Sequence, residues 1–259
     1  MCSVPFLERA GRGSRIRARE PLSSGNHKNE SLIVMQPRPA STLALLRDST
    51  HGPEVLMLQR THRAVFMPGH YVFPGGAVDD ADQGTALADL IRGHDDASAS
   101  ALLGLERGGL GYLVAAVREC FEEAGVLLAQ DRAGNDVSPD HPVLGADREA
   151  VARGRLSLDS LYREYDLVLP LDRIAYLDHW ITPLGPPRRF DTRFFVAAAP
   201  RAQVPVHDGQ ETIDHCWLRP AMALEDHRAR RRQFATPTLA VLRRLAGFSS
   251  VEHALADHG

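Results

Sequence analysis

Cysteine is scarce in this sequence. Its 259 residues include three cysteines, an odd number at widely separated positions, namely Cys2, Cys120 and Cys216. This spacing argues against a disulfide framework and against a zinc site built on paired cysteines. A few free cysteines are typical of a reducing compartment, so we expect a cytoplasmic protein.

Long hydrophobic segments and a strong net charge are also lacking. No apolar run approaches the roughly 18–20 residues that a membrane-spanning helix needs. The N-terminal residues lack the apolar core of a secretory signal, and the C-terminal ALADHG is not a peroxisomal address of the SKL type. The formal net charge of -3 provides no general attraction to nucleic acid or to an anionic membrane. We therefore expect neither of these as a partner.

The remaining composition is that of an ordinary globular protein. Hydrophobic residues make up 44% of the chain and charged residues 24%, and the length is sufficient for a large buried core. Residues 1–34 are rich in Arg, Gly and Ser and have no sustained apolar period, which predicts a disordered tail. Residues 35–259 are expected to form a single domain.

Strand and helix patterns alternate along this domain. The apolar stretches predict strands at 41–48, 54–60, 70–78, 175–184 and 192–200. Helices are predicted at 111–124, 147–166, 217–231 and 236–247, with short helical patterns between 83 and 110. The strand at 70–78 is expected to run into a turn formed by Gly75 and Gly76. This mixture of elements indicates an α/β or α+β domain.

Three glutamates crowd the end of the predicted helix at 111–124. Glu119, Glu122 and Glu123 lie at spacings that place them side by side on a helix, where each like-charged pair costs roughly 0.2–0.5 kcal/mol. The helical wheel points all three away from the apolar face. Taken alone, this pattern is typical of a solvated amphipathic helix. Three carboxylates on a rigid element also suit Mg²⁺ or Mn²⁺, whose charge would offset the repulsion.

Two stretches together resemble the signature of the Nudix hydrolases. They are GGAVDDAD, which begins at Gly75, and RECFEEAGV, which begins at Arg118. The second stretch matches the family pattern at Arg118, Glu119, Glu122, Glu123, Gly125 and Val126. This resemblance implies a Nudix fold, in which a mixed β-sheet is sandwiched between helices. It also implies a metal-dependent hydrolase whose partner is a small nucleotide substrate.

The first half of the signature departs from the family pattern in two ways. Asp82 stands where the pattern has glutamate. Arg118 follows Gly76 by 42 positions, where the usual spacing is 14, so about 28 residues are inserted. We expect a helical insertion at about 83–110 that leaves the catalytic helix in place and reshapes the entrance for substrate.

The residues before the signature resemble a motif of the coenzyme A diphosphatase branch, including the split-box enzymes of animal peroxisomes. Arg60, Gly69 and the FPGG sequence at 73–76 are in register with it, whereas Thr61 and Val65 differ from it. The resemblance implies cleavage of the diphosphate bond of coenzyme A or acyl-CoA. A hydrolase of ADP-ribose or NADH-type nucleotides and a non-catalytic nucleotide sensor remain alternatives.

The resemblance also implies roles for individual residues. Glu119, Glu122 and Glu123 would bind Mg²⁺ or Mn²⁺, and Arg118 would brace a glutamate by an ion pair. The general base would be either Glu119 or, on a later loop, Glu211. The substrate-binding candidates are Arg60, Gly75, Gly76 and Asp82, and the arginines at 63, 188, 189 and 193 are interpreted as surface residues available to phosphate. Both a monomer and a homodimer fit the sequence.

Overall fold

The computed structural model describes residues 8–9, 36–83, 86–186 and 188–257. Within the predicted tail, the described residues 8–9 form a short strand, β1, which pairs with a later strand, β8. The rest of the predicted tail lies outside the described residues. No helix among the described residues is long and apolar enough to cross a membrane.

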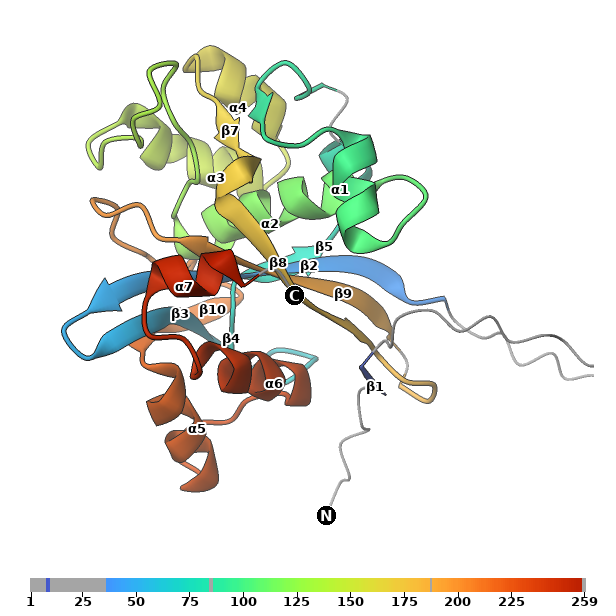
Figure 1. Ribbon diagram of the computed structural model, residues 1–259, viewed down its shortest axis with the longest axis vertical. Coiled ribbons are helices and arrows are strands. Elements are labelled where there is room, and N and C mark those ends of the chain that lie inside the picture. The colour runs from blue at the N-terminus through green and yellow to red at the C-terminus, as the bar shows by residue number, and fades with distance from the viewer. Residues whose placement is uncertain (1–7, 10–35, 84–85, 187, 258–259) are drawn as a thin grey trace, which may run out of the picture.

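A mixed β-sheet forms the centre of the molecule (Figure 1). Its strands follow the order β1-β8-β9-β2-β3-β10, with β4 paired to β3 and β5 paired to β2. β2 and β9 are parallel, and the other pairs described in this sheet are antiparallel. The strands are β1 (Glu8–Arg9), β2 (Arg38–Ser49), β3 (Gly52–Arg60), β4 (Tyr71–Val72), β5 (Gly75–Ala77), β8 (Ile174–Ile181), β9 (Phe190–Ala198) and β10 (Thr212–Leu218). A second, parallel pair joins β6 (Ile91–Arg92) and β7 (Leu169–Pro170).

Helices cover both faces of the sheet (Figure 1). One face carries α1 (Asp96–Leu103), α2 (Gly109–Ala124), α3 (Ala146–Ala152) and α4 (Leu158–Glu164). The other face carries α5 (Pro220–Arg228), α6 (Thr236–Leu245) and α7 (Val251–Ala256). Short 3₁₀ turns occupy Asp80–Gln83, Pro142–Leu144 and Leu171–Arg173.

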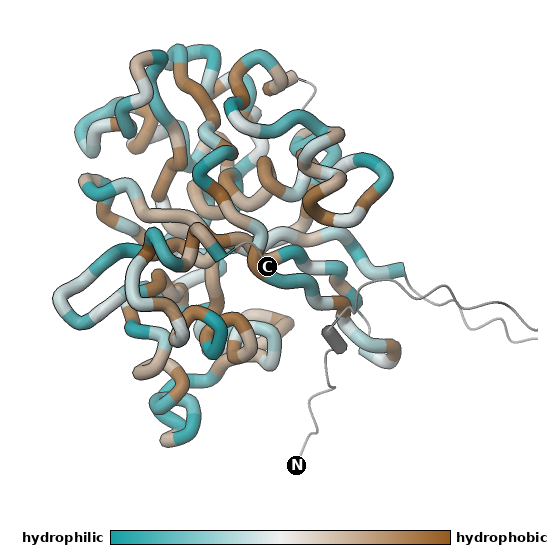
Figure 2. The backbone as a smooth tube through the Cα atoms, viewed as in Figure 1, coloured by the Kyte–Doolittle hydropathy of each residue, from teal (hydrophilic) through white to brown (hydrophobic). Residues whose placement is uncertain are grey.

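The central strands are apolar throughout because both of their faces are buried. On β2, Leu43 and Leu45 pack toward α2, whereas Ala44 and Leu46 pack toward α6 and α7. Such continuous apolar runs are expected of strands covered on both sides. Hydrophobic residues accordingly follow the central strands and the inner helices, while many outer loops are hydrophilic (Figure 2).

Most of the predicted elements are present, with four corrections. The stretch 70–78 is not one strand, because Phe73 and Pro74 separate β4 from β5. The segment 147–166 is two helices, α3 and α4, and residues 86–92 form turns and β6 instead of a helix. Residues 217–218 belong to β10, so the predicted helix at 217–231 begins at Pro220 and ends at Arg228.

The insertion supports the start of α2, the helix that carries the glutamates. Asp96 of α1 accepts hydrogen bonds from the N–H groups of Gly108 (3.0 Å) and Leu110 (3.1 Å). The hydroxyl of Ser100 accepts a third, from the N–H of Gly109, at 2.9 Å. These side chains cap N–H groups that lack partners within the first turn of a helix. Gly108, the N-cap residue of α2, has no side chain that could accept these hydrogen bonds, so side chains of α1 accept them instead.

Candidate active site

Gly75 and Gly76 bring strand β5 against helix α2. Neither glycine has a positive φ, and both lie in β5, paired with Thr42 and Ser41 of β2. A Cβ atom on Gly76 would lie 2.4 Å from Oε1 of Glu119. The predicted paired-glycine turn is therefore wrong. These residues lack side chains because the carboxylate of Glu119 and the backbone of β2 occupy that space.

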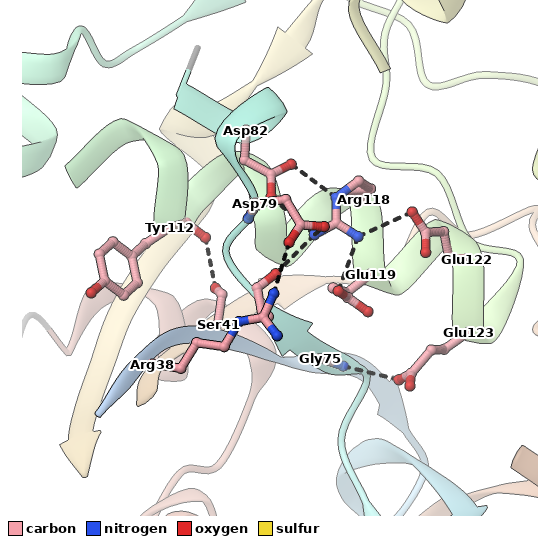
Figure 3. Close-up of polar contacts among 11 residues, drawn as sticks. Arg38, Ser41, Gly75, Asp79, Asp82, Tyr112, Arg118, Glu119, Glu122 and Glu123 are labelled. Carbon is pink, nitrogen blue, oxygen red and sulfur yellow. Dashed lines mark hydrogen bonds and ion pairs between the residues drawn. The ribbon is translucent and has the colours of Figure 1, made fainter. Parts of the chain in front are cut away.

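Arg118 connects the acidic groups of the site (Figure 3). Its Nε and Nη2 donate to the two carboxylate oxygens of Asp82 at 2.8 and 2.9 Å, and Nη2 also donates to the carbonyl of Ala77 at 2.9 Å. Its Nη1 donates to Glu119 at 2.9 Å and to Glu122 at 3.1 Å. Burial opposes the positive charge of Arg118, but these hydrogen bonds and carboxylates raise its pKa overall.

The three glutamates occupy different environments. Burial raises the pKa of Glu119 to about 7, although the charge of Arg118 opposes the rise. Burial also raises the pKa of Glu122. Glu123 is 6% exposed and accepts a hydrogen bond from the N–H of Gly75 at 3.0 Å. Its pKa rises well above the ordinary value, first because of burial and then because of the negative charge of Glu119.

The position of Glu123 corrects the helical-wheel prediction. The wheel places all three glutamates on a face directed away from the core, but β5 packs on that face and buries Glu123. Among the described residues, no three His, Cys, Asp or Glu side chains converge as a ready coordination shell. Arg118 engages Glu119 and Glu122, while Gly75 engages Glu123.

The charge balance of the site nevertheless fits a divalent cation. The guanidinium of Arg118 faces the carboxylates of Glu119, Glu122 and Asp82, and Glu123 lies beside them (Figure 3). Four carboxyl groups thus lie around one guanidinium in a mostly buried place, and a divalent cation would favour their ionised forms. Carboxylate oxygens are the ligands that Mg²⁺ and Mn²⁺ prefer. The residues present thus have the chemistry to hold such an ion.

Comparison with known proteins places the chain in a family. A family model described as the NUDT19 Nudix domain matches residues 106–245, which is more than half of the 259 residues. The chain belongs to the NUDT19 Nudix domain family. The predicted Nudix membership is therefore confirmed.

Curated relatives and one solved structure agree with this assignment. The chain is 29% identical over 243 residues to the human acyl-coenzyme A diphosphatase NUDT19 and 25% identical over 238 residues to that of Xenopus laevis. These matches cover 77% and 79% of this chain but 62% and 63% of the relatives, so the chain spans under two thirds of their length. The crystal structure of a Nudix hydrolase from Alicyclobacillus acidocaldarius matches with a TM-score of 0.72 and 27% identity, covering 86% of this chain and 98% of that one. The predicted Nudix fold, a mixed sheet between helices, is confirmed.

Asp82, which stands where the Nudix pattern has glutamate, holds the guanidinium of Arg118 in place. It is 2% exposed, and both of its carboxylate oxygens accept hydrogen bonds from Arg118. The N–H of Asp79 donates to the same side chain at 2.8 Å. Its oxygens are thus buried and bonded within the Nudix box, and the predicted role of Asp82 in substrate binding stays a prediction.

Arg60 and Glu211 lie at the other end of the site, near Glu123. The negative charge of Glu211 contributes to the raised pKa of Glu123, and the positive charge of Arg60 acts against it. The Glu211 side chain is exposed, on a loop whose N–H groups at 210–212 donate to the carboxylate of Asp208. The N–H of Thr61 donates to the Glu211 carbonyl at 2.8 Å, which ties this loop to the end of β3. The catalytic and substrate-binding roles of both residues stay predictions.

Two contacts around the Nudix box were not anticipated. Arg148 donates two hydrogen bonds, at 3.0 and 2.9 Å, to the carbonyl of Glu122 and so caps the end of α2. Arg193, interpreted as a surface residue, is 5% exposed, and its guanidinium lies over the ring of Tyr112 with 5.7 Å between them. Neither contact has a local pattern in the sequence, because the partners come from distant segments.

Proposed function

We propose that this protein is a divalent-metal-dependent diphosphatase that hydrolyses coenzyme A or acyl-CoA. The observation that carries the proposal is the buried carboxylate set of α2, organised by Arg118 and held against the glycines of β5, in a chain of the NUDT19 Nudix domain family. The curated relatives named above are acyl-coenzyme A diphosphatases, which supports this choice of substrate class.

Each residue of the site has a role in this proposal. Glu119, Glu122 and Glu123 hold Mg²⁺ or Mn²⁺, which, when bound, neutralises phosphate charge and lowers the pKa of a coordinated water. Arg118 positions two of these glutamates by its hydrogen bonds. Arg60 contacts a phosphate of the substrate from the end of β3, where a guanidinium pairs readily with phosphate oxygens.

Water attack at phosphorus requires a proton acceptor, and two carboxylates can serve. Burial raises the pKa of Glu119 to about 7 in the metal-free site, and a bound cation would lower it and favour the ionised form that a base requires. Glu211 lies on a loop tied to β3 and near Glu123. Pre-steady-state rates of Glu119→Gln and Glu211→Gln, measured across pH, distinguish them. The variant that lacks the base loses the dependence of the chemical step on a basic group.

The reaction is tested by product analysis. The protein is incubated with coenzyme A, acyl-CoA, ADP-ribose and NADH, with and without Mg²⁺ or Mn²⁺, and the products are identified by mass. We expect 3′,5′-ADP and 4′-phosphopantetheine from coenzyme A, only with metal, and not from Glu123→Gln. Glu164→Gln, an exposed glutamate on α4, serves as the matched control.

Two outcomes contradict the proposal. Cleavage of ADP-ribose or NADH with inert coenzyme A would assign the protein to the nucleotide-conjugate hydrolases. Saturable nucleotide binding without turnover of any of the four compounds would indicate a sensor.

A further inference from the structure

A cavity of about 790 Å³ opens beside the N-terminal half of α2. The insertion in the Nudix box contributes one side through Leu105 and Arg107. The remaining lining includes Arg38 at the start of β2, Val78 and Asp79 after β5, and Tyr112 of α2. Its volume lies in the range of about 300–1,000 Å³ that is usual for small-molecule sites.

The cavity adjoins the carboxylate site through Asp79. Asp79, which lines it, lies 3.8 Å from Nη2 of Arg118, and Nη1 of the same guanidinium contacts Glu119. Tyr112 precedes Glu119 by seven residues on α2, about 10 Å along the helix axis. Figure 3 shows Arg38 and Tyr112 on one side of Arg118 and Glu123 on the other. A substrate whose diphosphate lies at the glutamates would therefore have the cavity beside one of its ends.

The charges of the lining select the kind of group that fits. Two arginines, Arg38 and Arg107, face three aspartates at 79, 80 and 96, so carboxylates outnumber guanidinium groups. Arg38 is itself paired with Asp79 at 3.3 Å. Such a lining disfavours a phosphate monoester. Its apolar members, Pro39, Val78 and Leu105, favour a neutral, partly apolar group.

We propose that this cavity binds the neutral, amide-bearing pantetheine arm of the substrate, with any attached acyl group. The phosphorylated nucleoside then lies at the opposite end of the site, toward Arg60, whose positive charge acts on Glu123. This inference rests on the proposed function and assigns the insertion a role in substrate selection.

The cavity wall is fixed before substrate arrives. The Ser41 hydroxyl donates to the Tyr112 carbonyl at 2.6 Å, and the guanidinium of Arg193 covers the Tyr112 ring. Asp96 accepts the N–H of Gly108, which holds the loop that carries Arg107. A preformed wall lowers the entropic cost of ordering a flexible arm.

Two neighbouring residues give a matched test. Arg107 lines the cavity and Glu106 does not, and both side chains are exposed on the same loop. Arg107→Trp partly fills the cavity, whereas Glu106→Trp places the same ring beside it. Gln83→Trp fills the cavity from another wall and replaces Arg107→Trp if that variant fails to fold.

Isothermal titration with pantetheine measures the binding directly. We expect pantetheine to bind wild type and Glu106→Trp alike and to bind the filled variant about tenfold more weakly, with binding of 3′,5′-ADP unchanged. The filled variant should also show a KM for coenzyme A that is raised about tenfold, with kcat within about twofold of wild type.

Three results would overturn the inference: no binding of pantetheine to wild type, equal binding to all variants, or a loss confined to 3′,5′-ADP. Each of these can occur while wild type still hydrolyses coenzyme A, which leaves the proposed function intact. Failure of the proposed function is seen separately, as absence of coenzyme A hydrolysis by wild type.

Discussion

Substitution of Gly76 by alanine is expected to disable the candidate site without unfolding the protein. The added Cβ would lie 2.4 Å from Oε1, 2.6 Å from Cδ and 2.8 Å from Oε2 of Glu119. Ordinary contacts between such atoms are about 3.5 Å, so the carboxylate must move by roughly 1 Å. A displacement of this size in a catalytic group can reduce the rate about 100-fold.

Gly75→Ala is the control for this substitution. Its Cβ would meet the carbonyl oxygen of Ser41 at 2.4 Å and Cα of Thr42 at 2.7 Å. These atoms belong to the backbone of β2 and cannot rotate away, unlike the carboxylate of Glu119. We therefore expect Gly75→Ala to lose about 1–3 kcal/mol of unfolding free energy, and Gly76→Ala to lose under about 1 kcal/mol.

Urea denaturation and metal-dependent hydrolysis of coenzyme A, measured on the same preparations, test this pair. The reasoning is refuted if Gly76→Ala keeps wild-type activity, or if it is destabilised as much as Gly75→Ala.

Three other predictions concern stability. Arg118→Ala leaves the carboxylate of Asp82 buried without its partner, so it should lower the unfolding free energy by about 3–5 kcal/mol in urea denaturation. Glu122→Gln, at the rim of the same network, should lower it far less. Equal losses in the two variants would contradict the central position of Arg118. In metal-free protein, burial raises the pKa of Glu119 from 4.5 to about 7, so ionising this side chain between these pH values destabilises the folded state. The unfolding free energy of Glu119→Gln should therefore exceed that of wild type by about 3 kcal/mol at pH 8 and equal it near pH 4. A pH-independent difference in chemical denaturation would refute this. Asp96→Ala removes the cap of α2 and should lower the unfolding free energy by about 0.5–2 kcal/mol, and an unchanged thermal midpoint would contradict the capping role.

The sequence predicts those parts of the fold whose signal is local. β2 and β3 carry apolar runs, and α2 has a clear helical period and a glycine at its end, so their positions are predicted closely. Residues 86–92 have a helical period but form turns and β6, because β6 pairs with β7 from nearly 80 positions later. The strand β10 was missed, since its apolar residues do not alternate with polar ones and its position is specified by pairing with β3.

In the candidate site, too, some features follow from local sequence and others depend on tertiary structure. The cluster of Glu119, Glu122 and Glu123 is evident from spacing and from the resemblance to the Nudix box. The burial of Glu123 is not, because a helical wheel contains no information about β5 packing on the polar face. The bidentate pair between Asp82 and Arg118 also depends on tertiary structure, since 36 positions separate its partners.

Direct measurement of Mn²⁺ binding tests the central claim, that the glutamates of α2 hold a divalent cation. Free Mn²⁺ is followed by electron paramagnetic resonance during titration of wild type, Glu123→Gln and the exposed control Glu164→Gln. We predict saturable binding by wild type and Glu164→Gln, and affinity at least about tenfold lower for Glu123→Gln. Equal Mn²⁺ affinity in all three proteins would contradict the account.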